Sequence, residues 1–321
     1  MNKAPKIVFF GTPDFAVPSL KFLHENNYPI TAVVTIPDKP AGRGLKLTSS
    51  AVKEYAVANH LKLIQPANLK NEDFLNELKS LEADLFVVVA FRILPDVIWS
   101  MPPLGTFNLH ASLLPQYRGA APINWAIING EKETGITTFF LNHNIDTGKV
   151  IFRESSMIGK HETAGDIHER LKVTGAQLVL RSVQAIQEGN VYTFNQEQLG
   201  EGKVLNPAPK LTRENTRIDK RKRPEELTHF ICGLSPTPGA HTQICSAQGI
   251  SFTLKIFSVN PFMEKHTFPV GTVKTDNKTF LKIYLPGGYV TIEELQLSGK
   301  SKVKIKDFLN GTKMEGDWHI E

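Results

Sequence analysis

The stretch Leu85–Ala90, LFVVVA, is apolar at every position and has the length of a single strand. A strand with side chains buried on both faces reads as a continuous apolar run, whereas a strand with one face in water alternates apolar and polar residues. The stretch therefore predicts a central strand of a sheet that is covered on both sides. Its neighbours along the chain indicate which type of sheet this is.

Further apolar runs flank this stretch, and segments with helical spacing separate them. The runs are Lys6–Phe10, Ile30–Thr35, Leu61–Gln65, Thr106–His110 and Gly135–Leu141, and the helical segments are residues 13–25, 49–60, 71–81 and 121–129. Strands that alternate with helices favour parallel pairing, because each helix carries the chain back over the sheet. The first two thirds of the chain thus predict an α/β fold, a doubly wound and mostly parallel sheet of Rossmann-like type.

The pattern changes after a further helical segment at residues 164–188. Residues 200–224 are rich in Pro, Lys and Arg and lack periodicity, which predicts a linker. A short helix is expected at residues 225–234, strands at 241–246, 250–259, 271–275, 279–285 and 289–296, and a closing helix at 302–309. Short, closely spaced strands are typical of a small β-barrel, here of OB type. We therefore expect one domain over residues 1–205 and a second over residues 206–321.

The composition excludes some classes of protein and suggests a partner. No apolar run approaches the roughly 20 residues of a membrane span, and Cys232 and Cys245 form neither a disulfide framework nor a zinc-ligand pattern, which favours a cytoplasmic protein. Residues 206–321 hold 17 Lys and Arg against 12 Asp and Glu, while residues 1–205 hold 20 of each. A basic second part suggests an anionic macromolecule as partner, although a solubilising surface explains the charge equally well.

The turn after the first strand argues against a dinucleotide cofactor. Gly11-Thr12-Pro13 stands where a dinucleotide-binding fold needs Gly-x-Gly-x-x-Gly. Because two of the three glycines are absent, the backbone cannot cradle a pyrophosphate in that way. NAD is therefore not expected.

A polar set gathers at the ends of two of the expected strands. Asn108 and His110 lie two residues apart on one strand, hence on the same face, and Asp146 follows the next strand. An Asn amide can donate to an oxygen that gains negative charge, a His can move a proton near pH 7, and a carboxylate can orient the His. Since no Ser or Cys nucleophile of the elbow type accompanies them, the set predicts attack by a substrate's own nucleophile, such as an amine on an acyl group.

Two longer segments around these residues resemble the signature segments of the 10-formyltetrahydrofolate-dependent formyltransferases. They are FNLHASLLPQYRGAAPINWAI (107–127) and ETGITTFFLNHNIDTGKVI (133–151). The resemblance implies that Asn108, His110 and Asp146 form the catalytic set. It also implies that 10-formyltetrahydrofolate is the co-substrate, without a metal, and that a turn binds it. That turn consists of Ser112, Leu113, Leu114 and Pro115.

Two other segments indicate the acceptor of the formyl group. FFGTPDFAVPSL (9–20) and PDKPAGRGLKLTSSAVKEYA (37–56) resemble the branch of the family that formylates initiator methionyl-tRNA. This implies that Arg43 contacts the tRNA and that residues 206–321 form a tRNA-binding domain. Glycines on both sides of Arg43 permit close approach, and Lys39 and Lys46 can attract phosphate. A monomer is expected.

Three other functions remain open at this point. The first is a formyltransferase acting on a small amine, such as an amino-sugar nucleotide or glycinamide ribonucleotide, although such an acceptor needs neither the Arg43 loop nor a basic second domain. The second is a hydrolase that releases formate from the same folate. The third is a non-enzymatic RNA-binding protein, against which the Asn/His/Asp set argues. His143, an extra titratable group beside the set, is interpreted as a surface or pocket-rim residue.

Overall fold

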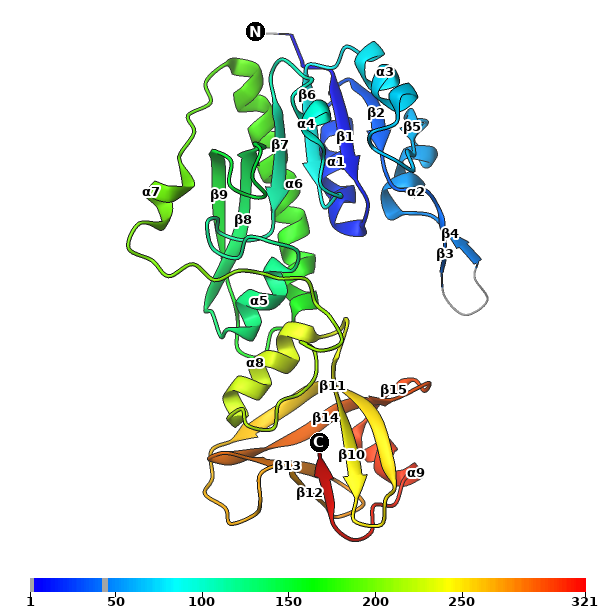
Figure 1. The fold of residues 1–321 in the computed structure, drawn as a ribbon, viewed down its shortest axis with the longest axis vertical. Helices are drawn as coiled ribbons and strands as arrows, with labels where there is room; N and C mark the ends of the chain where they lie inside the picture. The colour runs from blue at the N-terminus through cyan, green and yellow to red at the C-terminus, as the bar shows by residue number, and fades with distance from the viewer. Residues whose placement is uncertain (1–2, 42–45) are drawn as a thin grey trace. The chain divides into compact units, whose positions relative to one another are not determined.

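A computed structural model describes residues 3–41 and 46–321 and shows two compact units (Figure 1). Unit 1 comprises Met1–Pro122, Thr134–Ser156 and His168–Pro207, and unit 2 comprises Ile123–Glu133, Met157–Ile167 and Ala208–Glu321. The chain therefore passes between the units more than once before it enters the last part of unit 2. Within the described ranges, no helix combines the length and apolar character that crossing a membrane requires.

Unit 1 contains most of the α/β part of the chain. Its strands are β1 (Ile7–Gly11), β2 (Ile30–Val34), β3 (Lys39–Ala41), β4 (Lys46–Thr48), β5 (Leu63–Ile64), β6 (Leu85–Val89), β7 (Thr106–His110), β8 (Glu133–Phe140) and β9 (Val150–Met157). Its helices are η1 (Asp14–Ala16), α1 (Val17–Glu25), α2 (Ala51–Ala58), α3 (Glu72–Ser80), α4 (Asp96–Trp99), most of α6 (Ala164–Glu188) and α7 (Gln196–Gly200).

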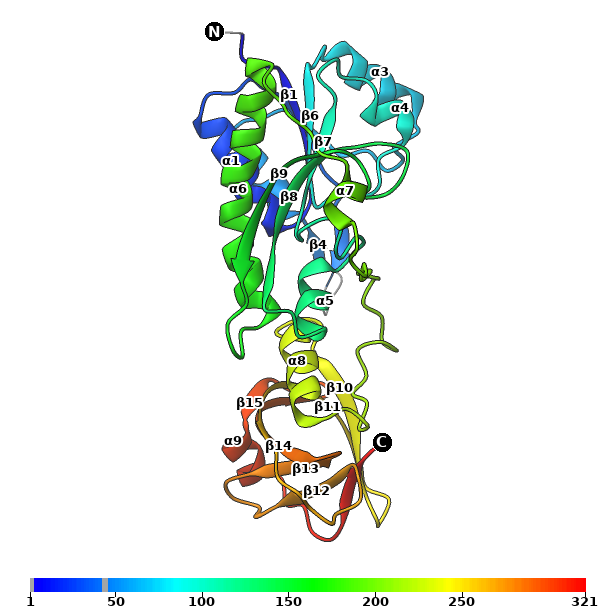
Figure 2. The same ribbon diagram turned by 90° about the vertical axis from the view of Figure 1, so that its left-hand side faces the viewer.

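The sheet of unit 1 confirms the predicted doubly wound architecture. In the part of the chain that the structure describes, its strand order is β5-β2-β1-β6-β7-β8-β9. The pairs from β5 to β7 are parallel, and β7 pairs with β8 in the antiparallel sense. Helices α1 and α6 lie on one face of the sheet and α3 and α4 on the other (Figure 2).

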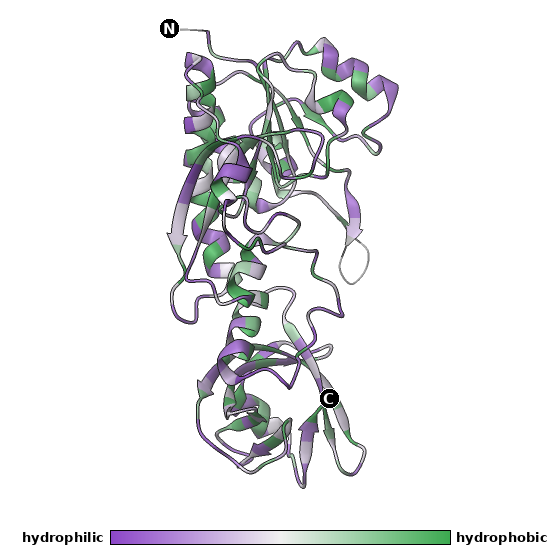
Figure 3. Cartoon of the chain, turned by 60° about the vertical axis from the view of Figure 1, so that its left-hand side comes forward, coloured by the Kyte–Doolittle hydropathy of each residue, from purple (hydrophilic) through white to green (hydrophobic). Residues whose placement is uncertain are grey.

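The continuous apolar runs form the inner strands because both faces of the sheet are covered. Every residue of β1 and β6 is buried. On one face, Val8, Phe10 and Val88 pack with Leu78 of α3 and Ile98 of α4. Apolar residues are concentrated along these strands, while α3 turns a polar surface outward (Figure 3). This packing places the carboxyl ends of β6 and β7 side by side, which is where ligands bind in such sheets.

Unit 2 confirms the predicted barrel and adds strands to it. Its strands are β10 (Ala240–Ser246), β11 (Ser251–Phe262), β12 (Thr272–Thr275), β13 (Leu281–Leu285), β14 (Gly288–Leu297), β15 (Lys302–Lys304) and β16 (Trp318–Ile320), and its helices include α5 (Pro122–Ile128), α8 (Pro224–Leu234) and α9 (Ile305–Gly311). Among the described residues the order is β11-β10-β16-β12-β13-β14-β15, and an antiparallel pairing of β11 with β14 closes the barrel.

Candidate active site

His110, at the end of β7, is almost completely buried and is held by the backbone. Its side chain is 7% exposed, and its ring meets the Phe139 ring edge-on with 6.5 Å between centroids. Nε2 lies 2.9 Å from the carbonyl oxygen of Tyr117. A carbonyl only accepts, so Nε2 carries the hydrogen of this bond. Nδ1 is therefore the ring nitrogen that can exchange a proton.

Asp146 lies in the turn between β8 and β9 and faces His110. Its Oδ2 accepts a hydrogen bond of 3.1 Å from the Gly119 N–H and stands 3.9 Å from His110 Nδ1. The second distance exceeds a direct hydrogen bond. The Asp146 backbone has a positive φ of 54°, which is costly for a residue with a side chain. The structure thus brings the predicted His and Asp together, without a direct hydrogen bond between Nδ1 and the carboxylate.

Gly148 explains how the turn fits against the sheet. A Cβ atom at this position would lie 1.6 Å from the carbonyl oxygen of Phe140, the last residue of β8. The Phe140 N–H in turn donates to the Lys149 carbonyl at 2.9 Å. Only glycine permits this close return of the chain, which places Asp146 beside the end of β7.

Asn108 lies in the middle of β7 with its amide half-buried. It pairs with Val88 of β6 and Phe139 of β8, so it shares a face with His110 two residues later. Within residues 3–41 and 46–321, no group forms a hydrogen bond with the Asn108 amide. Its two donors remain available to a ligand at this face.

The turn Ser112–Pro115 is tied to β8 by buried hydrogen bonds. The Thr137 hydroxyl donates to the Ser112 carbonyl at 2.7 Å and accepts from the Leu114 N–H at 3.1 Å. Arg153 Nη1 donates to the Leu114 carbonyl at 3.0 Å. The Leu114–Pro115 peptide is cis. The hydrogen bonds from Thr137 and Arg153 hold the turn in place just after His110 in sequence, while Leu113 remains half-buried.

Arg43 lies outside the described residues. The strands that precede and follow it in sequence, β3 and β4, pair with each other in the antiparallel sense, with Lys39 opposite Thr48. Lys39 is exposed, and so is Leu47 at 73%. Single exposed side chains of this kind are ordinary on a protein surface, so the contact of Arg43 with tRNA stays a prediction.

His143 lies on the surface, as expected from the sequence. Its Nδ1 stands 2.7 Å from Asp96 Oδ2, and its ring meets the Trp99 ring edge-on at 5.2 Å. The hydrogen bond from His143 lowers the pKa of Asp96. Because both side chains of this ion pair are more than half exposed, we assign His143 no part in the chemistry.

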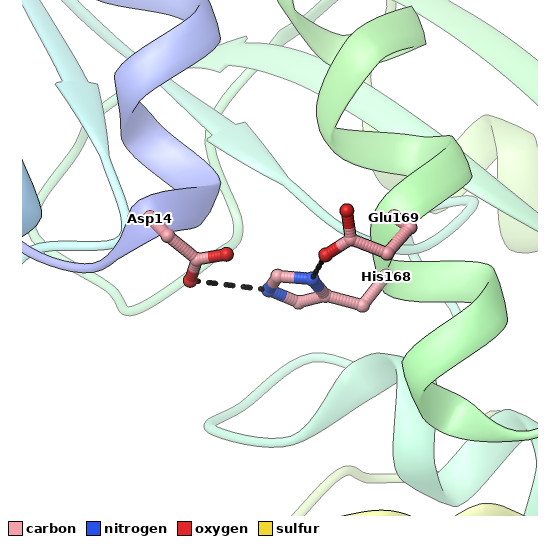
Figure 4. A group of neighbouring side chains, drawn as sticks. All are labelled: Asp14, His168 and Glu169. Carbon is pink, nitrogen blue, oxygen red and sulfur yellow. Dashed lines mark hydrogen bonds and ion pairs between the residues drawn. The ribbon is translucent and has the colours of Figure 1, made fainter.

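A second polar group, Asp14, His168 and Glu169, joins η1 to α6 (Figure 4). The oxygen and nitrogen atoms of this group lie within 4.8 Å of one another, which would suit a metal ion. However, Lys172 Nζ lies 2.5 Å from Glu169 Oε2 and 3.5 Å from Asp14 Oδ2. The ammonium group contacts both carboxylates and offsets part of their negative charge, so we interpret the cluster as an ion-pair network that fastens the segment after β1 to α6.

Sequence reasoning missed two groups that hold the site. The first is the Tyr117 carbonyl, which no side-chain motif can reveal because it belongs to the backbone. The second is Gln196 of α7, whose Nε2 donates to the carbonyl oxygens of Asp146 and Gly148. Gln196 lies 50 residues after Asp146 in the segment after α6. In the sequence, the only hint of Gln196 is that it lies between two apolar residues, Phe194 and Leu199, in an otherwise polar segment.

Both parts of the chain match known proteins. Residues 5–183 match the formyl transferase family and residues 210–313 match the formyl transferase C-terminal domain. The chain is 49% identical over 315 residues to the methionyl-tRNA formyltransferase of Bacteroides thetaiotaomicron, covering 98% of each chain. It is 48% identical over 306 residues to that of Flavobacterium johnsoniae, covering 95% of this chain and 96% of that protein.

Two solved structures share the fold at low sequence identity. WlaRD, a sugar 3N-formyl transferase solved with dTDP and 5-N-formyl-THF, superposes with a TM-score of 0.64 at 20% identity, covering 93% of this chain and 100% of that one. The N-formyltransferase of Helicobacter canadensis, in complex with folinic acid and dTDP-3-aminofucose, has the same TM-score and coverage at 21% identity. With both of its parts matched over most of their length, the chain belongs to the formyl transferase family.

Proposed function

We propose that the protein transfers the formyl group of 10-formyltetrahydrofolate to the α-amino group of initiator methionyl-tRNA, for translation initiation. The observation that carries this proposal is the match to proteins named methionyl-tRNA formyltransferase, 49% identical across 98% of both chains in one case. A likeness of this extent includes the acceptor-binding part of the molecule as well as the catalytic part. The same proposal assigns the catalytic roles to Asn108, His110 and Asp146.

The reaction starts with attack of the neutral methionyl amine on the formyl carbon. The carbonyl oxygen gains negative charge as the tetrahedral intermediate forms, and the Asn108 amide and protonated His110 donate to it. The amide suits this role because its donors are available at the face that His110 also occupies. The Tyr117 carbonyl holds the ring at Nε2, so donation to the oxygen falls to Nδ1.

The Asp146 carboxylate handles the proton that the amine loses. Asp146 Oδ2 stands 3.9 Å from His110 Nδ1, so a group bound to one side of the pair, such as water or the reacting amine, can contact both atoms. Collapse of the intermediate breaks the bond between the formyl carbon and N10 of the folate. N10 takes up a proton as it leaves, so the proton lost by the amine is returned and the reaction is balanced.

A surface of rings and lysines in unit 2 supports a role of residues 206–321 in RNA binding. Phe262 stacks on Tyr289 at 5.0 Å, Tyr289 meets Tyr284 at 5.5 Å, and Tyr284 meets Phe268 at 4.4 Å. Phe262 and Phe268 are 42% and 41% exposed, and Lys282 Nζ lies 4.2 Å above the Tyr289 ring. Exposed rings beside lysines are typical of surfaces that stack bases and attract phosphates.

We further propose a monomer that acts in the cytoplasm. Asn108, His110 and Asp146 all come from one chain, so the chemistry needs no second copy. Cys232 and Cys245 are both free, as is usual in a reducing compartment. Light scattering coupled to size exclusion tests the first statement, since a mass near 35.7 kDa is expected. A mass of twice that value would contradict it.

The decisive assay offers the protein 10-formyltetrahydrofolate together with methionyl-initiator tRNA. Formylmethionine on the tRNA is the expected product. A parallel reaction without tRNA measures formate release, and a third contains an amino-sugar nucleotide or glycinamide ribonucleotide in place of tRNA. Faster formate release, or faster formylation of a small amine, would contradict the proposed acceptor.

Variants of the two β7 residues test the catalytic assignment. We expect Asn108→Ala and His110→Ala each to lower kcat by about 10²–10³-fold, because each removes a group that stabilises the oxyanion. The melting temperature of Asn108→Ala should stay close to the wild-type value, since no described residue depends on its amide. Near-native kcat in both variants would remove these residues from the mechanism.

A further inference from the structure

The segment that follows α6 is bonded across the site instead of passing freely to unit 2. We call residues 194–206 the strap. Its Phe194 exchanges two backbone hydrogen bonds of 2.9 Å with Val150 of β9. Its Asn206 accepts from the Tyr117 N–H at 2.8 Å and donates through its own N–H to Gln116 Oε1 at 2.9 Å. The strap thus contacts both segments that hold His110 and Asp146.

Gln196 is the polar side chain buried inside the strap. It is 3% exposed, and its amide uses its full hydrogen-bonding capacity. Oε1 accepts from Arg118 Nε at 3.0 Å and Arg118 Nη2 at 2.7 Å. Nε2 donates to the carbonyl oxygens of Asp146 and Gly148, each at 2.9 Å. One side chain therefore joins the segment before Gly119 to the turn that carries Asp146.

Both segments determine where the Asp146 carboxylate lies. Its backbone is held at a φ of 54°, and such a conformation persists only where neighbouring contacts enforce it. Gln196 supplies two such contacts through the carbonyls on either side of Thr147. Through Arg118 it also fixes the residue next to Gly119, whose N–H binds the carboxylate at 3.1 Å.

Packing alone does not explain a glutamine at this position. The surroundings include an apolar cluster of Leu114, Phe139 and Val150, against which Leu199 of the same helix packs. A methionine or leucine at residue 196 would leave the carbonyl oxygens of Asp146 and Gly148 and the Arg118 donors without this partner. Leaving buried polar groups unpaired is costly, so the amide is required by the groups that it binds.

We propose that Gln196 is a positioning residue that sets the distance between the Asp146 carboxylate and His110 Nδ1 for formyl transfer. This inference rests on the proposed function, because it concerns the rate of that reaction. Misplacing a reacting group by about 1 Å can cost about 100-fold in rate. The change should affect kcat, since Gln196 is buried and bonds to the backbone of the turn that carries Asp146.

The isosteric variant Gln196→Glu keeps the bonds to Arg118 but removes the bonds to the carbonyls of Asp146 and Gly148. Glutamate keeps an oxygen for Arg118 but loses both N–H donors and sets an oxygen against the carbonyls of Asp146 and Gly148. We expect kcat to fall about 10- to 100-fold, with the KM for each substrate within about twofold of wild type. The control is Gln198→Glu, the same change at an exposed position of the same helix, which should keep wild-type kinetics. The proposal would be overturned if Gln196→Glu kept the wild-type kcat. It would also be overturned if the KM for either substrate rose by as large a factor as kcat fell.

A double-variant cycle tests whether Gln196 acts through Asp146. In an Asp146→Asn background, measured under single-turnover conditions, adding Gln196→Glu should cost less than about twofold, because the carboxylate that it positions is gone. An equal loss in both backgrounds would mean a separate structural role. Should Gln196→Glu fail to fold in a thermal melt, Gln196→Ala replaces it in the cycle, since it admits water to the two carbonyls. Absence of formyl transfer by the wild-type protein would refute the proposed function itself, whereas wild-type transfer with an unaffected Gln196→Glu refutes only this inference.

Discussion

At the level of single residues, a backbone carbonyl oxygen holds His110 at Nε2, on the side of the ring away from Asp146. Its Nε2 hydrogen is committed to Tyr117, and no side-chain substitution removes that partner. The ring therefore keeps its orientation when Asp146 is changed. In many His–Asp sites, replacing the carboxylate removes both the orientation of the imidazole and the negative charge beside it. Here a change at Asp146 removes the charge while the bond to Tyr117 keeps the orientation.

Asp146→Asn uses this separation. Asparagine keeps an oxygen that can accept from the Gly119 N–H but removes the negative charge. We expect kcat to fall by about 10²–10⁴-fold, because proton transfer from the amine loses its acceptor, while the melting temperature changes little. The control is Asp96→Asn, which removes an exposed carboxylate of the neighbouring surface pair. A kcat within twofold of wild type would show that the charge is not used.

Gly148→Ala tests the close return of the chain after Asp146. The added Cβ would overlap the Phe140 carbonyl oxygen, so the turn must move away from β8. Overpacking of this kind costs about 1–3 kcal/mol, which lowers the melting temperature by several degrees. Kcat should fall with it, since Asp146 moves with the turn. Gly311→Ala is the control, because nothing lies within 4 Å of its added Cβ; equal melting temperatures for the two variants would contradict the argument.

At the level of elements, β8 holds two different partners through neighbouring threonines. Thr137 binds the Ser112–Pro115 turn, whereas Thr138 shares a hydrogen bond of 2.8 Å with Ser182 of α6. Both hydroxyls are buried. Replacing either by valine keeps the shape and should cost about 1–3 kcal/mol, because the partner groups stay buried.

The two valine variants differ in their expected kinetics. Thr137→Val loosens the turn that we propose as a folate contact, so it should raise the KM for 10-formyltetrahydrofolate several-fold. Thr138→Val should lower the melting temperature by a similar amount and leave that KM unchanged. Steady-state kinetics with each substrate varied in turn distinguish the two. Identical folate KM values would remove the turn from folate binding.

The turn between β12 and β13 gives unit 2 a pH dependence. Hydrogen bonds, first from the Thr279 hydroxyl and then from backbone N–H groups of residues 278–280, hold the pKa of Asp276 well below its ordinary value. A lowered pKa means stability that is present above the unfolded-state pKa, near pH 4, and is lost as the pH falls further.

Asp276→Asn should therefore be less stable than wild type at pH 7, and the difference should shrink toward pH 3. Thermal melts of both proteins across this range provide the measurement. Glu264→Gln, an exposed change in the same unit, is the control and should show no such trend. A difference in melting temperature that stays constant with pH would exclude the carboxylate as its cause.

The elements that sequence patterns predicted are those with one strong periodic signal. The runs that became β1 and β6 are continuous apolar stretches that are buried at every position, and α6 keeps helical spacing over its whole length. Strand β9 was missed because VIFRESSM turns polar halfway, where its burial also ends. Helix α7 was missed because its five residues are too short for a period.

The candidate site shows the same division between local and distant information. Asn108 and His110 lie two residues apart on one strand, so their common face follows from the spacing. The contacts of Gln196 with Arg118 and Asp146 join residues that lie 78 and 50 positions apart, and no short-range pattern encodes them. Residues 200–224 were therefore interpreted as a linker, although the first of them belong to the strap.

At the level of the whole molecule, the positive charge of residues 206–321 predicts a salt-dependent reaction. Binding of tRNA releases counterions from its phosphates, so the KM for tRNA should rise at least about tenfold between 50 and 200 mM salt. The KM for folate should change far less. Lys282→Ala should reduce the slope of log KM for tRNA against log salt concentration by about 1, because one phosphate contact is lost. Arg43→Ala should raise the KM for tRNA or lower kcat with tRNA. A flat salt dependence would contradict tRNA binding through this surface.

The strap has a consequence for synthesis of the protein. Chains emerge from the ribosome with the N-terminus first, and domains fold as their segments appear. By the time β9 has emerged, every strand of the first sheet and the whole proposed catalytic set are available, yet Gln196 and Asn206 are not. A nascent chain can thus form the sheet early and still be inactive, because the turn carrying Asp146 gains its support only when the strap closes over it.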